Sequence, residues 1–288
     1  MISIALHAML LDDARRTRAF GRALAEVVRP GDVVADLGCG TGILSLLALQ
    51  AGASRVYAVE EGRAAWVARA VARENGVADR MRVIRGRSQR IRLPERVDVV
   101  VTETLGHLVL DEGILEIAAD ARRRFLRRGG RFVPSRVRVM GAPAAAPGGR
   151  SWSYGVALGA VRALALHTPT VLPRPRLLGP PRVLAEVELG RDEVPVEASG
   201  RWRVREAAGL AVWFDADLSP SVRLASLRSS SWSPTFVPAR RPRRGRFEFG
   251  ATFGKDGALT WRFDGDAAQD TALGSARRYA RMSRTTFP

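Results

Sequence analysis

The sequence contains a single cysteine, Cys39, so the chain cannot form an internal disulfide bond. Histidine is also scarce. His7, His107 and His167 are the only three, and their spacing matches no metal-binding pattern. No cluster of cysteine or glutamate residues accompanies them, so we expect no metal site.

Long apolar runs are missing as well. No stretch approaches the roughly eighteen apolar residues that a membrane-spanning helix needs. The first residues include His7, Asp12 and Asp13, whereas a signal peptide has a basic start and a clean apolar run. The sequence therefore predicts a cytoplasmic protein with no membrane partner.

The positive charge comes almost entirely from arginine, because Lys255 is the only lysine in a chain with a net charge of +17. The arginines are dispersed over both halves of the sequence. Nucleic-acid sites typically interleave basic residues with aromatic ones, and this sequence shows no such pattern. We therefore predict no nucleic-acid partner. The densest arginine run, residues 239–246, is predicted to be a solvated loop between two strands.

With 288 residues, of which 46% are hydrophobic, the chain can bury a substantial core. Apolar runs and helical patterns alternate in the first part, which predicts a doubly wound α/β domain over residues 1–134. The predicted strands are 33–37, 56–60, 81–86, 97–103 and 131–134, and the predicted helices include 42–51, 64–75 and 113–126. Short alternating runs then predict an antiparallel, β-barrel-like domain over residues 135–288, with strand-forming segments at 136–140, 182–189, 209–218 and 247–263.

A glycine-rich turn, Asp36-Leu37-Gly38-Cys39-Gly40-Thr41-Gly42, stands between the first apolar run and a helical pattern. Glycine allows the backbone to approach a ligand closely at a helix N-terminus. The spacing of Gly42, with Asp36 before the turn, fits an amino-acid cofactor better than a pyrophosphate. Glu60 ends the next apolar run, where a carboxylate can accept hydrogen bonds from both ribose hydroxyls. These features predict S-adenosylmethionine as the cofactor.

Two glutamates, Glu103 and Glu112, flank residues 104–111 after the predicted strand 97–103. A pair of carboxylates beside a methyl donor suits a guanidinium. Arginine stays protonated and S-adenosylmethionine carries a positive sulfonium, so bringing the two to about 4 Å costs roughly 4 kcal/mol at an effective dielectric near 20. Two glutamates can cancel this repulsion and match the planar fork of guanidinium donors.

Residues 7–140 resemble the catalytic domain of the protein arginine methyltransferases, which are class I methyltransferases with a second, β-barrel domain. The likeness rests on residues 7–15, on the glycine turn and on residues 102–112 with their two glutamates. It implies that Glu103 and Glu112 clamp the guanidinium and that Arg15 holds the cofactor carboxylate. The cofactor-binding residues that it implies are Arg15, Asp36, Gly38, Gly40, Thr41, Gly42, Glu60 and Gln89.

The resemblance extends to Ser230-Ser231-Trp232, which stands where the family carries Thr-His-Trp. The histidine that would pair with Asp12 is absent, so Asp12, bulk water or a glutamate of the clamp must accept the proton that methylation releases. Trp232, Met9 and His107 are expected to line the substrate pocket, with His107 in place of a family tyrosine.

Residues 152–169 resemble the arm through which family members dimerise, which predicts a homodimer. The substrate is predicted to be arginine in a protein or peptide. Free arginine or another guanidino metabolite is an alternative, because no family-type helix precedes His7. A catalytically weak binding partner that retains the fold is a second alternative. From the net charge of +17 alone, we expect repulsion of basic peptides that added salt relieves.

Overall fold

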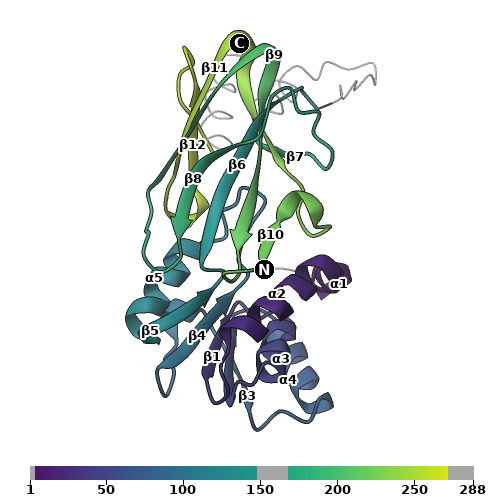
Figure 1. The fold of residues 1–288 in the computed structure, drawn as a ribbon, viewed down its shortest axis with the longest axis vertical. Coiled ribbons are helices and arrows are strands. Elements are labelled where there is room, and N and C mark those ends of the chain that lie inside the picture. The colour runs from purple at the N-terminus through teal and green to yellow at the C-terminus, as the bar shows by residue number, and fades with distance from the viewer. Residues whose placement is uncertain (1–3, 148–167, 272–288) are drawn as a thin grey trace, which may run out of the picture.

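The computed structural model describes residues 4–147 and 168–271. A parallel sheet with its helices forms the lower half of Figure 1, and an antiparallel sheet forms the upper half. The predicted dimerisation arm at 152–169 lies almost wholly outside the described residues. The homodimer therefore stays a prediction.

The parallel sheet has five strands in the order β3-β2-β1-β4-β5. All residues of its central strand β1 are buried, as expected for a strand that helices cover on both faces. The order reverses between β1 and β4, and ligands of such sheets bind at the carboxyl ends of the strands at this point. The strands are β1 (Val33–Leu37), β2 (Arg55–Glu60), β3 (Met81–Arg85), β4 (Val97–Thr102) and β5 (Leu126–Val133).

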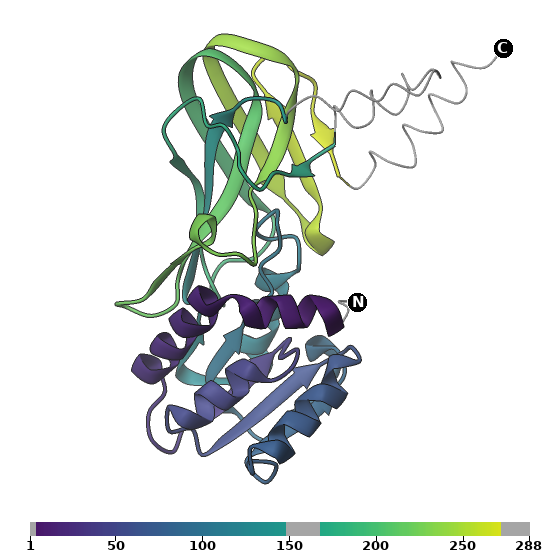
Figure 2. The ribbon, with the colours of Figure 1, turned by 90° about the vertical axis from the view of Figure 1, so that its right-hand side faces the viewer.

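Helices cover both faces of this sheet. In Figure 1, α3 and α4 lie on one side of the sheet and α5 lies beside β5 on the other. Figure 2 shows α1 lying across the junction between the two sheets. The helices are α1 (Ile4–Asp12), α2 (Ala14–Val27), α3 (Ile43–Gln50), α4 (Ala64–Glu74) and α5 (Ile114–Arg124).

The antiparallel sheet begins directly after β5, with Pro134 and Ser135 between the two sheets. Its hydrogen-bonded path is β13-β12-β11-β9-β6-β8, and β10 and β7 pair with β9 and β11. Aromatic rings fill its core, with the Phe247 and Phe263 centroids 5.1 Å apart. The strands are β6 (Arg136–Ala144), β7 (Thr170–Val171), β8 (Arg182–Glu188), β9 (Val196–Asp217), β10 (Arg223–Ala225), β11 (Thr235–Phe253), β12 (Leu259–Phe263) and β13 (Gln269–Asp270).

The predicted fold class, an α/β domain followed by an antiparallel sheet, is confirmed. Every predicted strand and helix of the parallel half is present, although β5 starts earlier than predicted. The segment 247–263 forms parts of two strands, β11 and β12, which the 3-10 helix η3 (Lys255–Gly257) joins. In the described residues the path ends at β13 and β8, so closure into a barrel stays a prediction.

The prediction of a loop at residues 239–246 was wrong, because this run lies inside β11. The pairing of β11 with β9 shifts register between Pro238 and Arg243 and again before Gly245, so the prolines and glycine sit in an irregular part of a long strand. The expected solvation is present, because Arg240, Arg241, Arg244 and Arg246 are exposed. Arg243 is partly buried and pairs with Asp266, whereas Arg244 pairs with Glu206 at 2.6 Å while its side chain stays 79% exposed.

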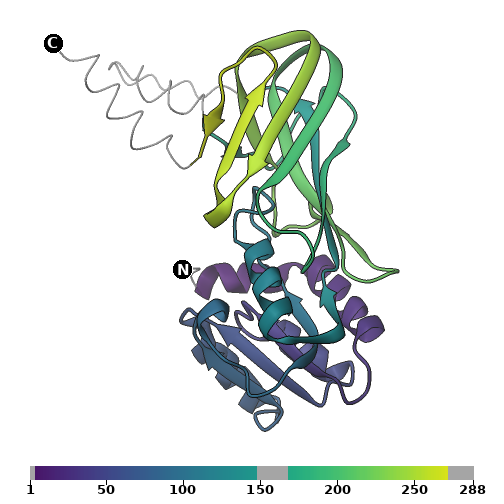
Figure 3. The same ribbon diagram turned by 90° about the vertical axis from the view of Figure 1, so that its left-hand side faces the viewer.

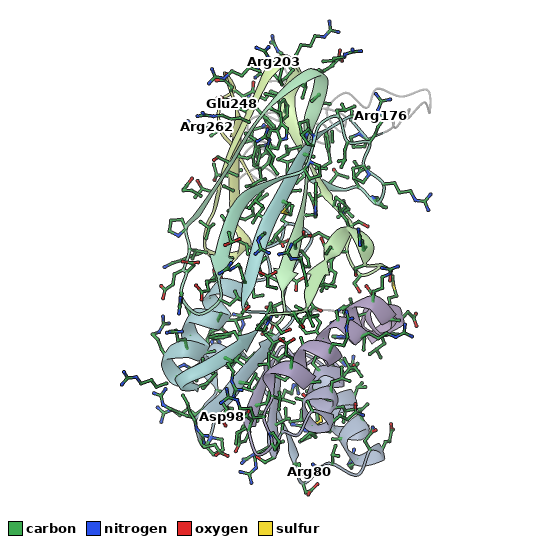
Figure 4. The ribbon with its side chains drawn as sticks, viewed as in Figure 1. Arg80, Asp98, Arg176, Arg203, Glu248 and Arg262 are labelled. Carbon is green, nitrogen blue, oxygen red and sulfur yellow. The ribbon has the colours of Figure 1, made fainter. Side chains whose placement is uncertain are left out.

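Figure 4 shows that charged side chains are spread over the molecule. The labelled Arg80 lies at the free end of the parallel half, whereas Arg203 and Arg262 lie on the antiparallel half. This agrees with the dispersed pattern in the sequence.

Candidate active site

A cavity of about 590 Å³ lies at the carboxyl ends of the parallel strands and is the candidate active site. It collects residues that directly follow β1, β2, β3 and β4, which is where the strand order predicts a ligand. Predicted site residues that line it are Gly38, Gly40, Thr41, Glu60, Gln89, Glu103 and Glu112. Further lining residues are His7, Leu10, Arg16, Glu61, Asp111 and Glu116.

The glycine turn after β1 forms one wall of this cavity. Gly38 and Gly40 adopt positive φ angles of 78° and 54°, which glycine accommodates without strain. The amides of Gly38 and Cys39 donate to the Val59 carbonyl at 2.9 and 3.0 Å, which fixes the turn against β2. A Cβ on Gly40 would lie 2.9 Å from the His7 ring, so this ring packs directly on the turn.

Two predicted members of the cofactor site, Gly42 and Asp36, lie at the two ends of the turn and do not line the cavity. Gly42, at φ 90°, precedes α3, and a Cβ there would lie 2.6 Å from the Met81 side chain. Asp36 is fully buried and accepts a hydrogen bond from the Ser45 hydroxyl at 2.7 Å. Burial raises the pKa of Asp36 to about 7. Neither residue lines the cavity, so we assign them the support of the turn and of α3, in place of the predicted contact with a ligand.

Glu60 and Gln89 line the cavity as predicted. The Glu60 carboxylate accepts hydrogen bonds from the Gly40 amide at 3.1 Å and from the Gly62 amide at 2.6 Å. Gln89 lies in the 3-10 helix η1 (Ser88–Arg90), where its amide oxygen accepts from the Ser88 hydroxyl at 3.1 Å. Both side chains offer acceptor oxygens, the groups that ribose hydroxyls and an adenine amino group require.

The arginine of the site is Arg16, and the prediction of Arg15 was wrong by one residue. Arg16 is 5% exposed and donates from Nε to Glu103 at 2.9 Å and also from Nη2. Arg15 is exposed and lies in a separate groove beside Arg18 and Arg22. The shift arises at the start of α2, where the side chain of Asp13 caps the helix by accepting the Arg16 amide at 3.0 Å.

The same shift applies to the acidic residue. Asp12 is exposed, whereas Asp13 is buried and accepts from the backbone of Ser230 at 3.0 Å, the hydroxyl of Ser231 at 2.8 Å and the hydroxyl of Ser229. Burial alone would raise the pKa of Asp13, but these donors and the Arg16 amide hold it at about 2. Asp13 is therefore a fixed anion near neutral pH. It anchors α2 to the serine segment instead of accepting a proton.

The two glutamates share the cavity but have different surroundings. The Glu103 side chain is 8% exposed, and burial raises its pKa although Arg16 opposes this effect. Glu112 is exposed toward the cavity, and no residue in the described ranges donates a hydrogen bond to it. Partial desolvation, followed by the charges of Glu103 and Asp111, raises the pKa of Glu112 to about 7.

The segment between the glutamates is strained. Val109, at φ 73°, is the one non-glycine residue with positive φ in the part of the chain that the structure describes. Such a conformation costs about 1 to 3 kcal/mol and persists only where the surroundings impose it. Asp111 orders the segment by accepting the Leu108 amide at 3.1 Å.

The structure places the predicted pocket residues Met9, His107 and Trp232 outside the cavity lining. Met9 is 64% exposed, and its neighbour Leu10 lines the cavity instead. Trp232 is buried behind the glutamate segment, where its indole N–H donates to the Leu105 carbonyl at 2.6 Å.

His107 is exposed and lies against Ser233, with 3.1 Å from its Nδ1 to the Ser233 carbonyl oxygen. Sequence reasoning also missed His7, because nothing local distinguishes a pocket histidine from a surface one. Burial lowers the pKa of His7.

Two other kinds of feature are absent from the described residues. No group of three or more potential metal ligands occurs there. No helix among these residues is long and apolar enough to cross a membrane.

Comparison with known proteins gives matches over most of the chain. A family model described as "Ribosomal protein L11 methyltransferase (PrmA)" matches residues 17–137. A probable protein arginine N-methyltransferase 6 of Arabidopsis thaliana is 31% identical over 238 residues, which cover 75% of this chain and 55% of that protein. The chain thus spans little more than half the length of this relative.

Solved structures of arginine methyltransferases also match this chain. A Trypanosoma brucei PRMT1 enzyme–prozyme heterotetrameric complex with AdoHcy matches with a TM-score of 0.80 at 22% identity, covering 93% of this chain and 98% of that chain. Arabidopsis thaliana protein arginine methyltransferase 10 matches with a TM-score of 0.72 at 23% identity, covering 91% and 94%. By sequence and by fold, this chain is a relative of the protein arginine N-methyltransferases and has their class I methyltransferase fold.

Proposed function

We propose that this chain transfers a methyl group from S-adenosylmethionine to a guanidino nitrogen of arginine in a protein or peptide. The observation that carries this proposal is the pairing of Glu103 and Glu112 in one cavity with the glycine turn and Glu60. The alternative of a catalytically weak partner would leave this arrangement unexplained.

The residues present fit the cofactor. Gly38 and Gly40 bring bare backbone to the cavity wall, and Glu60 at the end of β2 offers a carboxylate for the ribose hydroxyls. Arg16 lines the cavity, and its Nη1 group makes only a long 3.5 Å contact to the Leu10 carbonyl, so it has donor capacity left for a carboxylate. When bound, S-adenosylmethionine supplies a methyl group on a positively charged sulfonium.

The glutamates supply what a guanidinium acceptor needs. Glu103 is held by Arg16 and fixes one side of the clamp, while Glu112 on the other side accepts no hydrogen bond from the residues that the structure describes. A bound guanidinium would lower the pKa of Glu112 and keep it ionised. The nitrogen loses a proton as it gains the methyl group. We assign the first acceptor role to Glu112, because Asp13 is held as an anion with a pKa of about 2.

Glu60→Ala is expected to weaken S-adenosylhomocysteine binding by about 1.5 to 3 kcal/mol, because hydrogen bonds from ribose to a charged acceptor are lost. Isothermal titration calorimetry measures the change. Glu61→Ala is the matched control, because Glu61 lines the same cavity but its side chain is 58% exposed in an ion pair with Arg87. Equal affinity in the two variants would remove Glu60 from the cofactor site.

The local charge of the cavity bears on the substrate. Six carboxylates line it, whereas Arg16 and Arg87 are its only lining arginines among the described residues. Screening limits an exposed charge to a range of about 10 Å, so we expect this acidic lining to act on a substrate at the cavity more than the net charge of +17 does. The structure therefore favours attraction of arginine-rich peptides, opposite to the sign expected from net charge.

The proposed function is tested by methyl transfer from tritiated S-adenosylmethionine to an arginine-rich peptide and to free arginine, each at low and moderate salt. We expect labelling of the peptide that falls as salt is added. Labelling of free arginine alone would support the small-molecule alternative, and absence of transfer to either substrate would contradict the proposal. A homodimer and a cytoplasmic location remain predictions from the sequence.

A further inference from the structure

The turn between β11 and β12 lies in close contact with the backbone of Asp111, the residue before Glu112. Gly257 in this turn has φ 71°, and a Cβ there would lie 3.0 Å from the Cα and carbonyl carbon of Asp111 and still closer to its carbonyl oxygen. The neighbour is backbone, so no side-chain movement could relieve the contact. Figure 3 shows the turn descending from the antiparallel sheet toward the start of α5.

Asp111 in turn orders the segment that carries the second glutamate. Its carboxylate accepts the Leu108 amide at 3.1 Å and lies so close to Gly106 that a Cβ there would be 2.6 Å from Asp111 Cγ. The strained Val109 lies between these residues and would relax if the segment were released.

Residues 232–235, which lead into β11, hold this segment at other points. Trp232 donates to the Leu105 carbonyl at 2.6 Å, the Thr235 hydroxyl donates to the His107 carbonyl at 2.8 Å, and His107 Nδ1 lies 3.1 Å from the Ser233 carbonyl oxygen. These contacts lie toward Glu103, which Arg16 also holds. Glu112 has no donor of its own among the described residues, so its place depends on the backbone on either side of it, at Asp111 and at Gly113 before α5.

We propose that the β11–β12 turn is a positioning element for the active site, in which Gly257 seats Asp111 and thereby sets Glu112 opposite Glu103. The antiparallel sheet then positions Glu112 through this contact, although none of the sheet's residues lines the cavity. This inference rests on the proposed methyl transfer for its kinetic test, but it also has a test that needs no activity.

The test compares G257N with G245N. Gly245 in β11 has φ 77°, and a Cβ added there would have no atom within 4 Å, so the two positions share a backbone conformation and differ in the contact. Asparagine tolerates this conformation better than other residues with a side chain, which favours folding of both variants. We expect G257N to lower kcat by at least about tenfold while leaving KM for the cofactor within about twofold, because only the clamp is displaced. G245N should match the wild type.

Hydrogen–deuterium exchange of residues 106–112 supplies the second readout, with faster exchange expected in G257N alone. Equal kcat and equal exchange in the two variants would overturn the inference. If the wild type transfers no methyl group to any arginine substrate while exchange still differs, the proposed function fails and the positioning of the segment stands. Similar thermal midpoints of the two variants would show that the comparison is between folded proteins.

Discussion

Arg16→Ala is expected to lower methyl transfer by about a thousandfold or more and to destabilise the protein by about 3 to 5 kcal/mol, as removal of one partner from a buried ion pair does. The Arg16 and Glu103 side chains are 6% and 8% exposed, so Glu103 would be left as a buried charge without its partner. The carboxyl group would then take up a proton, and the clamp would lose one of its two charges. Initial rates and urea denaturation measure the two effects.

Arg15→Ala is the matched control, because Arg15 is the neighbouring residue on the same helix but is exposed and outside the cavity. It should change the free energy of unfolding by less than about 0.5 kcal/mol, as surface substitutions do. A larger loss of activity in Arg15→Ala than in Arg16→Ala would support the sequence prediction that Arg15 is the arginine of the site.

Glu112→Gln is expected to lower kcat by about a hundredfold or more with S-adenosylhomocysteine affinity nearly unchanged, because an amide neither offsets the guanidinium charge nor accepts its proton. Glu112 lines the cavity but, within the described residues, makes no hydrogen bond to the glycine turn. Glu103→Gln should cause a similar loss of rate but should also weaken the ion pair with Arg16. Turnover like that of the wild type in Glu112→Gln would eliminate the clamp.

Glu112 also sets the expected pH dependence of kcat/KM. The pKa of Glu112 is about 7, and the active form carries the ionised carboxylate. In the free enzyme, kcat/KM should therefore rise as the pH increases toward 7 and level off above it. Substrate guanidinium stays protonated throughout and lowers the pKa of Glu112, so the limb in kcat should lie at lower pH. The kcat/KM limb should be lost in Glu112→Gln, and its persistence would assign it to another group.

The sequence itself determined the parallel half of the fold. The strands β1 and β4 are short and mostly apolar, with Val-Val-Ala-Asp-Leu in β1 and Val-Asp-Val-Val-Val-Thr in β4, and the helices between the strands carry apolar residues at helical spacing. Local periodicity was therefore enough to predict this half. The glycine turn and Glu60 were also readable, because a backbone that must approach a ligand requires glycine at fixed positions.

The antiparallel half was less readable. Residues 239–246 contain a proline, a glycine and five arginines that favour a loop, yet they lie in β11, where the pairing with β9 shifts register around them. Asp266 pairs with Arg243 and Glu206 pairs with Arg244. These partners are distant in the sequence, so no local pattern contains them.

Residues distant in the sequence also decided which side chains of α1 and α2 face the site. Asp12 and Asp13, like Arg15 and Arg16, are adjacent residues of the same type, and composition cannot choose between them. The choice was made by Ser229, Ser230 and Ser231, which hold Asp13, and the capped first turn of α2 then aims Arg16 at Glu103.

The sequence alone determined the glycine turn and the strand-end carboxylates of the site, because both follow from local backbone requirements. Only the tertiary structure decided which of two neighbouring residues enters the cavity and what holds Glu112 in place. The physical reason is that burial, ion pairing and the contact of Gly257 with Asp111 depend on residues that folding brings together from both sheets.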